Sequence, residues 1–127
     1  VSCDVATLCV GQAASSSAIL LAAGAPGKRV VLEHARVLLH QPHSELSRGS
    51  MSDLALEAAE LARVKAEAES ILSLHTGRTL DDVRRDTDRA LVLAGAEAVD
   101  YGVADVVANA ASGGQHLDAG TPLRPQP

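Results

Sequence analysis

The stretch DVATLCVGQAASSSAILLAAGAPGKRVVLEHARVLLHQP, residues 4–42, alternates short apolar runs with glycine and proline stops. Short runs rich in Val and Leu between such stops are typical of buried strands, whereas a longer run rich in Ala and Leu favours a helix. Gly24 and Pro26 end the helical run, and Pro42 ends the last strand. The predicted elements are strands over residues 5–10, 29–32 and 36–40, and a helix over residues 13–23.

A long helix is the clearest element of the remaining chain, and we predict it over residues 53–75. Ser50 or Ser52 is expected to cap its start, and Gly77 to end it. Apolar positions at helical spacing form a stripe: Leu54, Leu61, Val64, Ala68, Ile71 and His75. The charged positions are expected to be solvated surface: Glu57, Glu60, Lys65, Glu67 and Glu69.

The C-terminal third predicts two shorter helices and a strand. Thr79 and Asp82 form a capping-box pattern at the start of a helix that reaches about residue 88. A helix over residues 96–101, closed by Gly102, and a strand over residues 103–107 follow. This order of elements predicts an α/β protein. A single sheet for this length needs more strands than the layout supplies, so we expect further strands before Val1.

The composition bounds the domain organisation. We expect one domain over residues 1–110 and a disordered tail over residues 111–127, where Gly, Ser, Pro and polar residues show no periodicity. Almost all apolar residues are Ala, Val or Leu, and Tyr101 is the single aromatic. Such small side chains fill a core poorly unless the layers are thin and close or neighbouring subunits share the burial. The second alternative is a weak indication of oligomerisation.

Charge and hydropathy argue against several classes of protein. The formal net charge is −5, whereas nucleic-acid-binding domains carry clustered basic residues, so we expect no nucleic-acid partner. No apolar run reaches the ~18 residues of a membrane-spanning helix, and residues 1–10 lack the basic start of a signal peptide. Cys3 and Cys9, expected about 20 Å apart on one strand, are too distant for a disulfide. We therefore expect buried free thiols in a cytoplasmic protein.

Two side chains suggest catalytic chemistry. Ser15 lies at a junction from strand to helix, where backbone N–H groups can hold a developing oxyanion. His40 ends a strand beside a loop, a favourable place for a general base. Taken singly, Ser15 could equally be a helix cap and His40 a structural histidine. The other histidines, His34, His43, His75 and His116, lack metal-ligand spacing, so no metal or cofactor is expected.

Six segments together resemble the proteolytic subunit of the Clp protease. The similarity covers about residues 4–107, and the matching segments are residues 11–15, 24–29, 35–42, 75–77, 85–89 and 97–102. The resemblance implies a crotonase-like fold with a long handle helix and stacked rings of subunits that enclose a chamber. It also implies a serine endopeptidase that degrades proteins and peptides, and a Clp-family ATPase partner that unfolds and feeds them. The ring could be homomeric or heteromeric.

Site residues carry over position by position. The family's nucleophile falls on Ser15, its base on His40, and its oxyanion N–H donor on the residue after the nucleophile, Ser16. The handle helix falls on residues 53–75, whose apolar stripe would then form an intersubunit seam. An acidic residue and an arginine that pair across the ring interface fall on Asp88 and Arg89.

Three departures from the family's pattern leave two hypotheses open. The triad acid is replaced by Ala90, with Asp86 or Asp88 as possible substitutes, and the paired glycines after Pro42 are replaced by residues 43–46. The family's N-terminal portion has no counterpart here. The chain is therefore either a serine endopeptidase subunit or a catalytically impaired structural or regulatory ring subunit. An acyl-CoA hydratase of the same superfamily is a distant third.

Overall fold

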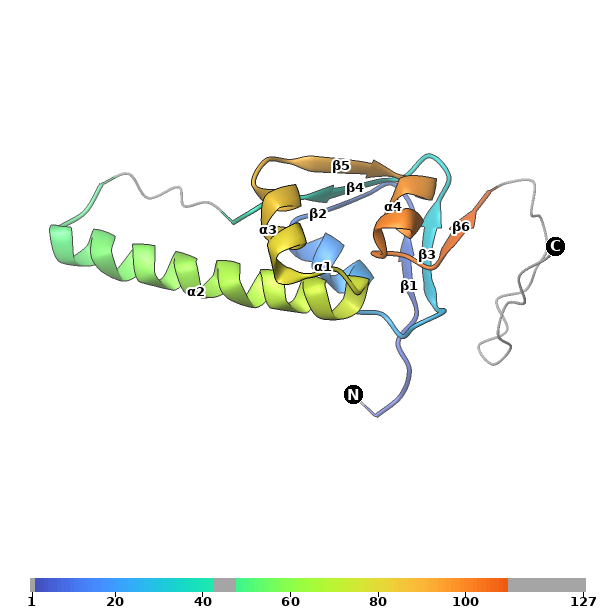
Figure 1. Cartoon of the computed structure of the whole chain (residues 1–127), viewed down its shortest axis with the longest axis horizontal. Coiled ribbons are helices and arrows are strands. Elements are labelled where there is room, and N and C mark those ends of the chain that lie inside the picture. Colours follow the sequence, from blue (N-terminus) through green and yellow to red (C-terminus); the bar gives the residue numbers. More distant parts are fainter. Residues whose placement is uncertain (1, 43–47, 110–127) are drawn as a thin grey trace.

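The structure, a computed structural model, describes residues 2–42 and 48–109. This part of the chain contains short strands, three short helices and one long helix (Figure 1). In order they are β1 (Thr7–Cys9), β2 (Gln12–Ala14), α1 (Ser16–Ala22), β3 (Arg29–Leu32), β4 (Arg36–Leu39), α2 (Met51–Thr76), α3 (Leu80–Thr87), β5 (Leu91–Ala94), α4 (Gly95–Tyr101) and β6 (Val106–Ala108). The α/β class is confirmed.

The strands form two sheets rather than the single sheet that we expected. In one sheet β3 lies between β1 and β6, and all strands are parallel. In the other, β4 pairs with β2 in parallel and with β5 antiparallel. The chain passes from the first sheet to the second twice, between β1 and β2 and between β3 and β4. These two crossings are joined where the Arg36 N–H donates to the Gly11 carbonyl, 2.9 Å away.

Sequence reasoning missed two strands, both in the second sheet. The strand β2 has the sequence Gln-Ala-Ala, which has low intrinsic strand propensity, and we had assigned it to the helix. It is extended because Ala13 and Ala14 pair with Val37 and Leu38 of β4. The strand β5 closes the other edge of β4. The final strand also begins three residues later than predicted, at Val106, where pairing with Val30 of β3 begins.

The core is built from small aliphatic side chains, as the composition indicated. Its largest fully buried members are Val31 of β3, Val37 and Leu39 of β4, Val83 of α3 and Val103. Alanines on α1 and α4 pack between these side chains. Since a small side chain lets a helix approach a sheet closely, the two sheets and the short helices enclose one thin apolar layer.

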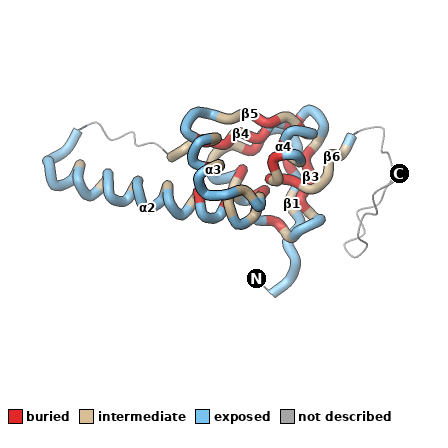
Figure 2. The backbone as a smooth tube through the Cα atoms, in the orientation of Figure 1, coloured by how far each residue is buried: buried red, intermediate tan, exposed pale blue. Residues whose placement is uncertain are grey.

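The long helix is attached to this core at one end only. Ser50 is its cap, with a complete capping box to Asp53, and Gly77 ends it in the left-handed conformation at φ 73°. Figures 1 and 2 show its N-terminal half projecting from the body and exposed. Its buried residues are Glu69 and Leu72, so the face that packs on α1 and α3 is shifted from the predicted stripe toward these two positions, and the stripe shares only part of it, such as half-buried Ala68. The stripe members Val64 and Ile71 are each 38% exposed.

Arg29, at the start of β3, joins the ends of three helices. Its Nη1 donates to the carbonyls of Ala22 at the end of α1 (3.1 Å), His75 in the last turn of α2 (3.0 Å) and Gly102 after α4 (2.8 Å). Helix C-termini carry unsatisfied carbonyls and partial negative charge, so one guanidinium satisfies all three. Asp105 neutralises it through Nε at 2.9 Å and Nη2 at 2.5 Å.

The helix ends meet closely around this guanidinium. Gly102 has φ 103°, and a Cβ there would lie 2.6 Å from the Thr76 carbonyl oxygen of α2. Only glycine allows the end of α4 to rest against the end of α2 at that distance. The arginine network and this close approach together fix where α2 leaves the body.

Two further sequence expectations concern the thiols and the membrane. Both cysteines are free; Cys9 is buried, but Cys3 is exposed because it precedes the strand, so the expectation of two buried thiols was wrong for Cys3. Burial raises the pKa of the Cys9 thiol. Among the described residues, no helix is both long and apolar enough to cross a membrane.

We predict that Asp105→Ala lowers the free energy of unfolding by about 3–5 kcal/mol, since it leaves the Arg29 guanidinium buried without a counter-charge. Denaturant unfolding at neutral pH measures this. The matched control is Asp4→Ala, which removes the exposed ion pair with Lys28 and should change stability little. Equal losses in the two variants would contradict the central role of the buried pair.

The same pair predicts a pH dependence. Hydrogen bonds from Arg29 hold the pKa of Asp105 below its usual range. Because the folded-state pKa lies below the unfolded value of about 3.9, the contribution is fully present above that value and is lost as pH falls through the folded-state pKa. The stability difference between the wild type and Asp105→Ala should therefore shrink below about pH 4. A difference that stays constant to pH 2 would contradict this.

Candidate functional site

Parallel pairing of β2 with β4 brings two predicted site residues together. Ala14 is opposite Leu38 in the register, and the Ser15 N–H donates to the Leu38 carbonyl at 3.1 Å. Ser15 directly follows β2, and His40 directly follows β4. Because parallel neighbours end at the same edge of a sheet, residues separated by a helix and a strand in sequence meet there.

Ser15 has an unusual backbone conformation. Its φ is 54° and its ψ is −120°, and it is the non-glycine residue with positive φ in the described part of the chain. Although it occupies the N-cap position of α1, its hydroxyl makes no capping hydrogen bond. Ser17 instead closes the turn, with its Oγ 2.7 Å from the Ala14 N–H and carbonyl. The helix-cap interpretation of Ser15 is therefore not supported by this geometry.

The sharp turn at Ser15 is typical of nucleophile elbows, in which strain keeps a hydroxyl accessible between a strand and a helix. Ser16 is the first residue of α1 and is exposed. The first N–H groups of a helix have no partner within it, so the Ser16 N–H is available to a developing negative charge beside Ser15.

His40 is half-buried and its ring is oriented by a neighbouring carbonyl. Its Nδ1 lies 2.9 Å from the Gln41 carbonyl oxygen. A carbonyl oxygen can only accept, so Nδ1 carries a proton in this contact, and in a neutral ring the lone pair is then on Nε2. This is the tautomer that a general base needs.

Ser15 and His40 line one cavity of about 70 Å³. Strand, loop and helix residues surround it: Ser16 and Ile19 of α1, Leu39, Gln41, Pro42, Thr87, and Val64, Lys65, Ala68, Glu69 and Leu72 of α2. The two residues predicted from sequence are thus accompanied by one face of the long helix.

Ala90 lines a second hollow, of about 460 Å³, which His40 also lines. Thr87, Asp88 and Arg89 line the same hollow. Within the described residues neither Asp88 nor Arg89 forms an ion pair, and both are exposed. The structure therefore places position 90 beside His40, where the sequence offers a methyl group and no acceptor.

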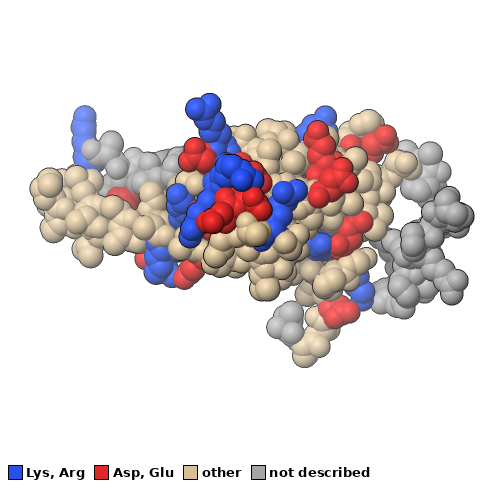
Figure 3. Space-filling view, viewed as in Figure 1, with Lys and Arg blue, Asp and Glu red and all other residues tan. Residues whose placement is uncertain are grey.

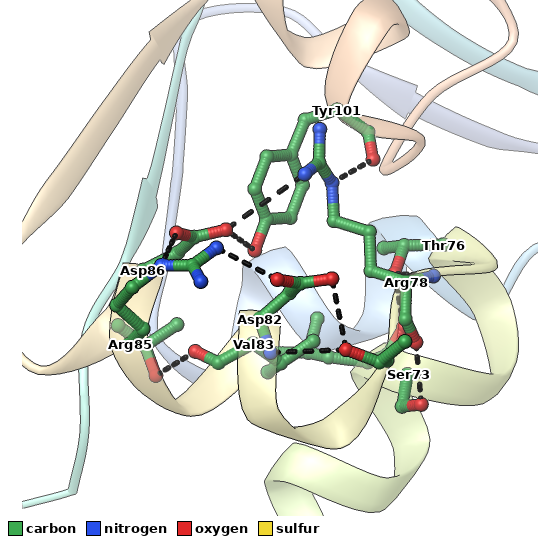
Figure 4. Close-up of polar contacts among 11 residues, drawn as sticks. Ser73, Thr76, Arg78, Asp82, Val83, Arg85, Asp86 and Tyr101 are labelled. Carbon is green, nitrogen blue, oxygen red and sulfur yellow. Dashed lines mark hydrogen bonds and ion pairs between the residues drawn. The ribbon is translucent and has the colours of Figure 1, made fainter.

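The two aspartates considered as substitute acids differ in position. Figure 4 shows Asp86 near Arg85, Arg78 and Tyr101. Asp86 accepts from the Tyr101 hydroxyl at 3.3 Å and pairs with Arg78 and Arg85, at 3.8 and 3.5 Å. Burial and then the Asp86 charge raise the pKa of Tyr101 to about 12, so the phenol stays protonated and donates. Asp86 lines neither hollow, whereas Asp88 shares one with His40.

Sequence reasoning missed Glu69, which was expected on the solvated face of α2. It is 4% exposed, its Oε2 accepts from Arg84 Nε at 2.8 Å, and its Oε1 has no hydrogen-bond partner among the described residues. The expectation was wrong because the packed face of α2 follows Ala68 and Leu72. One signal was present: Glu69 is directly after Ala68 and three residues before Leu72, both apolar.

The remaining sequence expectations concern metal sites and segments outside the described residues. In the described ranges, no group of three or more His, Cys, Asp or Glu is placed to hold a metal ion. Residues 43–47, which include the altered segment after Pro42, and residues 110–127, which include His116 and the predicted tail, lie outside the described residues.

Comparison with known proteins gives one consistent result. A family model described as Clp protease matches residues 1–111. The ATP-dependent Clp protease proteolytic subunit 4 of Rhodococcus jostii is 54% identical over 103 residues, covering 81% of this chain and 53% of the relative. Proteolytic subunit 1 of Corynebacterium glutamicum is 52% identical, covering 82% and 50%. The chain thus spans about half the length of the curated relatives it matches.

We predict that Ser15→Gly raises the free energy of unfolding by about 1 kcal/mol, because glycine adopts positive φ without strain. The matched control is Ser16→Gly, one residue later in helical geometry, which should lower stability by up to ~1 kcal/mol. Thermal and denaturant unfolding of both variants measure the difference. A loss of stability in both would show that the turn at Ser15 stores no strain.

Proposed function

The chain belongs to the Clp protease family, and we propose that it is a serine endopeptidase subunit in which Ser15 is the nucleophile and His40 the general base. The α/β structure with its parallel sheets is consistent with the crotonase-like fold of this family. The single observation that carries the proposal is the shared cavity of Ser15 and His40, with the serine at a strained turn.

The proposed reaction uses groups already in place. The Ser15 hydroxyl attacks a peptide carbonyl while His40 Nε2 takes its proton, and the Ser16 N–H donates to the oxyanion that forms. His40 then returns the proton to the departing amine. In the second half of the reaction, His40 takes a proton from a water molecule that attacks the acyl-enzyme, and the product acid leaves Ser15.

Ala90 makes this chain a weak catalyst under the proposal. The Gln41 carbonyl holds the tautomer of His40 but carries no full charge to stabilise the imidazolium. In another serine protease, disabling the triad aspartate lowers kcat by about 10⁴. A second candidate function therefore follows from Ala90 itself: an impaired structural or regulatory ring subunit that works beside active relatives. The hollow that Ala90 lines also includes Asp88, the substitute acid that the sequence offers there.

The proposed partners are other ring subunits, a Clp-family ATPase that unfolds and feeds substrates, and protein or peptide substrates, all in the cytoplasm. The projecting half of α2 supports ring assembly, since Met51 is 84% and Leu56 71% exposed. Figure 3 shows this part of α2 mostly uncharged on the face drawn, with charged side chains gathered over α3. Asp88 and Arg89, exposed and without an ion pair among the described residues, are proposed to pair across the ring.

We predict that a fluorophosphonate probe labels Ser15 slowly and that Ala90→Asp speeds labelling by at least about 100-fold, by supplying a carboxylate beside His40. The rate is measured on the purified chain alone and mixed with a full-length relative. Ser15→Ala controls for labelling elsewhere. Absence of labelling together with assembly into the relative's ring would select the regulatory function.

We also predict that Leu56→Lys reduces assembly while leaving the unfolding transition of the body unchanged, since Leu56 projects away from the core. Sedimentation velocity measures assembly. The matched control is Val92→Lys, an exposed apolar residue of β5 at 51% exposure, which should assemble as the wild type does. Unchanged assembly of Leu56→Lys would exclude α2 as the seam.

A further inference from the structure

We infer that Glu69 makes the cavity beside Ser15 selective for a basic substrate residue, one with an apolar stem and a cationic end, such as lysine. The inference rests on the proposed function and adds to it the class of side chain whose carbonyl Ser15 attacks. It depends on a carboxylate that the family resemblance did not point to and that the proposed chemistry does not use.

The starting observation is a buried acceptor without a donor. Glu69 is 4% exposed, and Arg84 satisfies Oε2 alone. Oε1 has no hydrogen-bond partner among the described residues. A buried carboxylate oxygen left without a donor is costly, and a lysine 4.0 Å away, too far for a hydrogen bond, offsets that cost only in part. A ligand that donates to Oε1 removes that cost when it binds.

The second observation is the cavity that Glu69 shares with Ser15, of about 70 Å³. Its lining is largely apolar and includes Ile19, Leu39, Val64, Ala68 and Leu72. A substrate side chain in this cavity therefore meets both apolar surface and a glutamate. This arrangement suits an aliphatic stem that ends in an ammonium group, because stem and charge each find a matching surface.

Lys65 is the present neighbour of Oε1 and is easily displaced. Its Nζ lies 4.0 Å from Oε1, within ion-pair range but beyond hydrogen-bond distance. Its side chain is 40% exposed, so it can turn into solvent when another cation arrives. Arg84, on the opposite oxygen and 53% exposed, can keep its bond throughout. We therefore assign Lys65 as a competitor for the site.

A role for Glu69 as the missing triad acid fits the structure less well. Position 90, where that acid is absent, lies in the other hollow, which Glu69 does not line. The Nδ1 atom of His40, to which a triad acid binds, contacts the Gln41 carbonyl. A specificity role also has a large expected effect, because sites with buried polar groups discriminate strongly against substrates that leave them unpaired.

The test compares two peptidyl phosphonate probes that differ only in the ammonium group at the end of one side chain. One carries lysine and the other norleucine at the residue next to the phosphorus, so both have the same aliphatic stem. On the full chain, labelling of Ser15 should be at least about tenfold faster with the lysine probe. Glu69→Gln should abolish the preference, and Lys65→Met should increase it. Glu67→Gln, an exposed glutamate of the same helix, should leave it unchanged.

A small fluorophosphonate without a side chain distinguishes failure of the specificity inference from failure of the proposed function. If it labels Ser15 while lysine and norleucine probes react equally, the specificity inference is overturned and the proposed function stands. If Glu69→Gln slows the small probe as well, Glu69 acts in catalysis and the inference is again overturned. If the small probe does not react at all, the proposed function fails. Fluorescence anisotropy with Ser15→Ala then decides the inference: tighter binding of the lysine peptide supports it, and equal binding rejects it.

Discussion

The guanidinium of Arg29 is the contact on which the architecture depends. It satisfies carbonyls at the ends of α1, α2 and α4 and is neutralised by Asp105. Without it, three partly negative helix ends would converge around Gly102 with no donor between them. This one network fixes the C-terminal end of α2 on the body, and that end carries the helix residues of the cavity beside Ser15. The site is thus positioned by a contact outside it.

At the candidate site, the backbone arrangement that positions the residues does not depend on the acidic side chain that the chemistry needs. The pairing of β2 with β4 brings Ser15 and His40 to one cavity, and the segment between α3 and β5 brings position 90 to a second hollow that His40 also lines. These backbone contacts do not require an acidic side chain at position 90. Ala90 therefore leaves the backbone arrangement intact and removes only the negative charge. A different carboxylate residue, Glu69, lines the cavity that Ser15 also lines. A helix that projects from the body at one end therefore contributes to the cavity at the other.

Much of the fold could be predicted from local sequence. Glycine and proline stops, the Ser50 and Thr79 caps and the Gly77 and Gly102 ends gave the helices to within a few residues, because capping is a local interaction. The strand β3 was predicted with its observed bounds. The strands β2 and β5 were not, because Gln-Ala-Ala and the short run before Gly95 are extended only through pairing with β4.

The family could be recognised from sequence, and so could Ser15 and His40, the two residues that most resemble catalytic groups, because they lie in local motifs of fixed order. Three further features became visible in the folded chain. It showed that the Ser15 hydroxyl does not cap α1, that Asp86 is engaged with Tyr101, and that Glu69 is buried. The first depends on the backbone turn at Ser15, and the other two depend on which side of a helix faces the body. That choice is made by packing against distant elements, and helical spacing alone misplaced the buried face of α2.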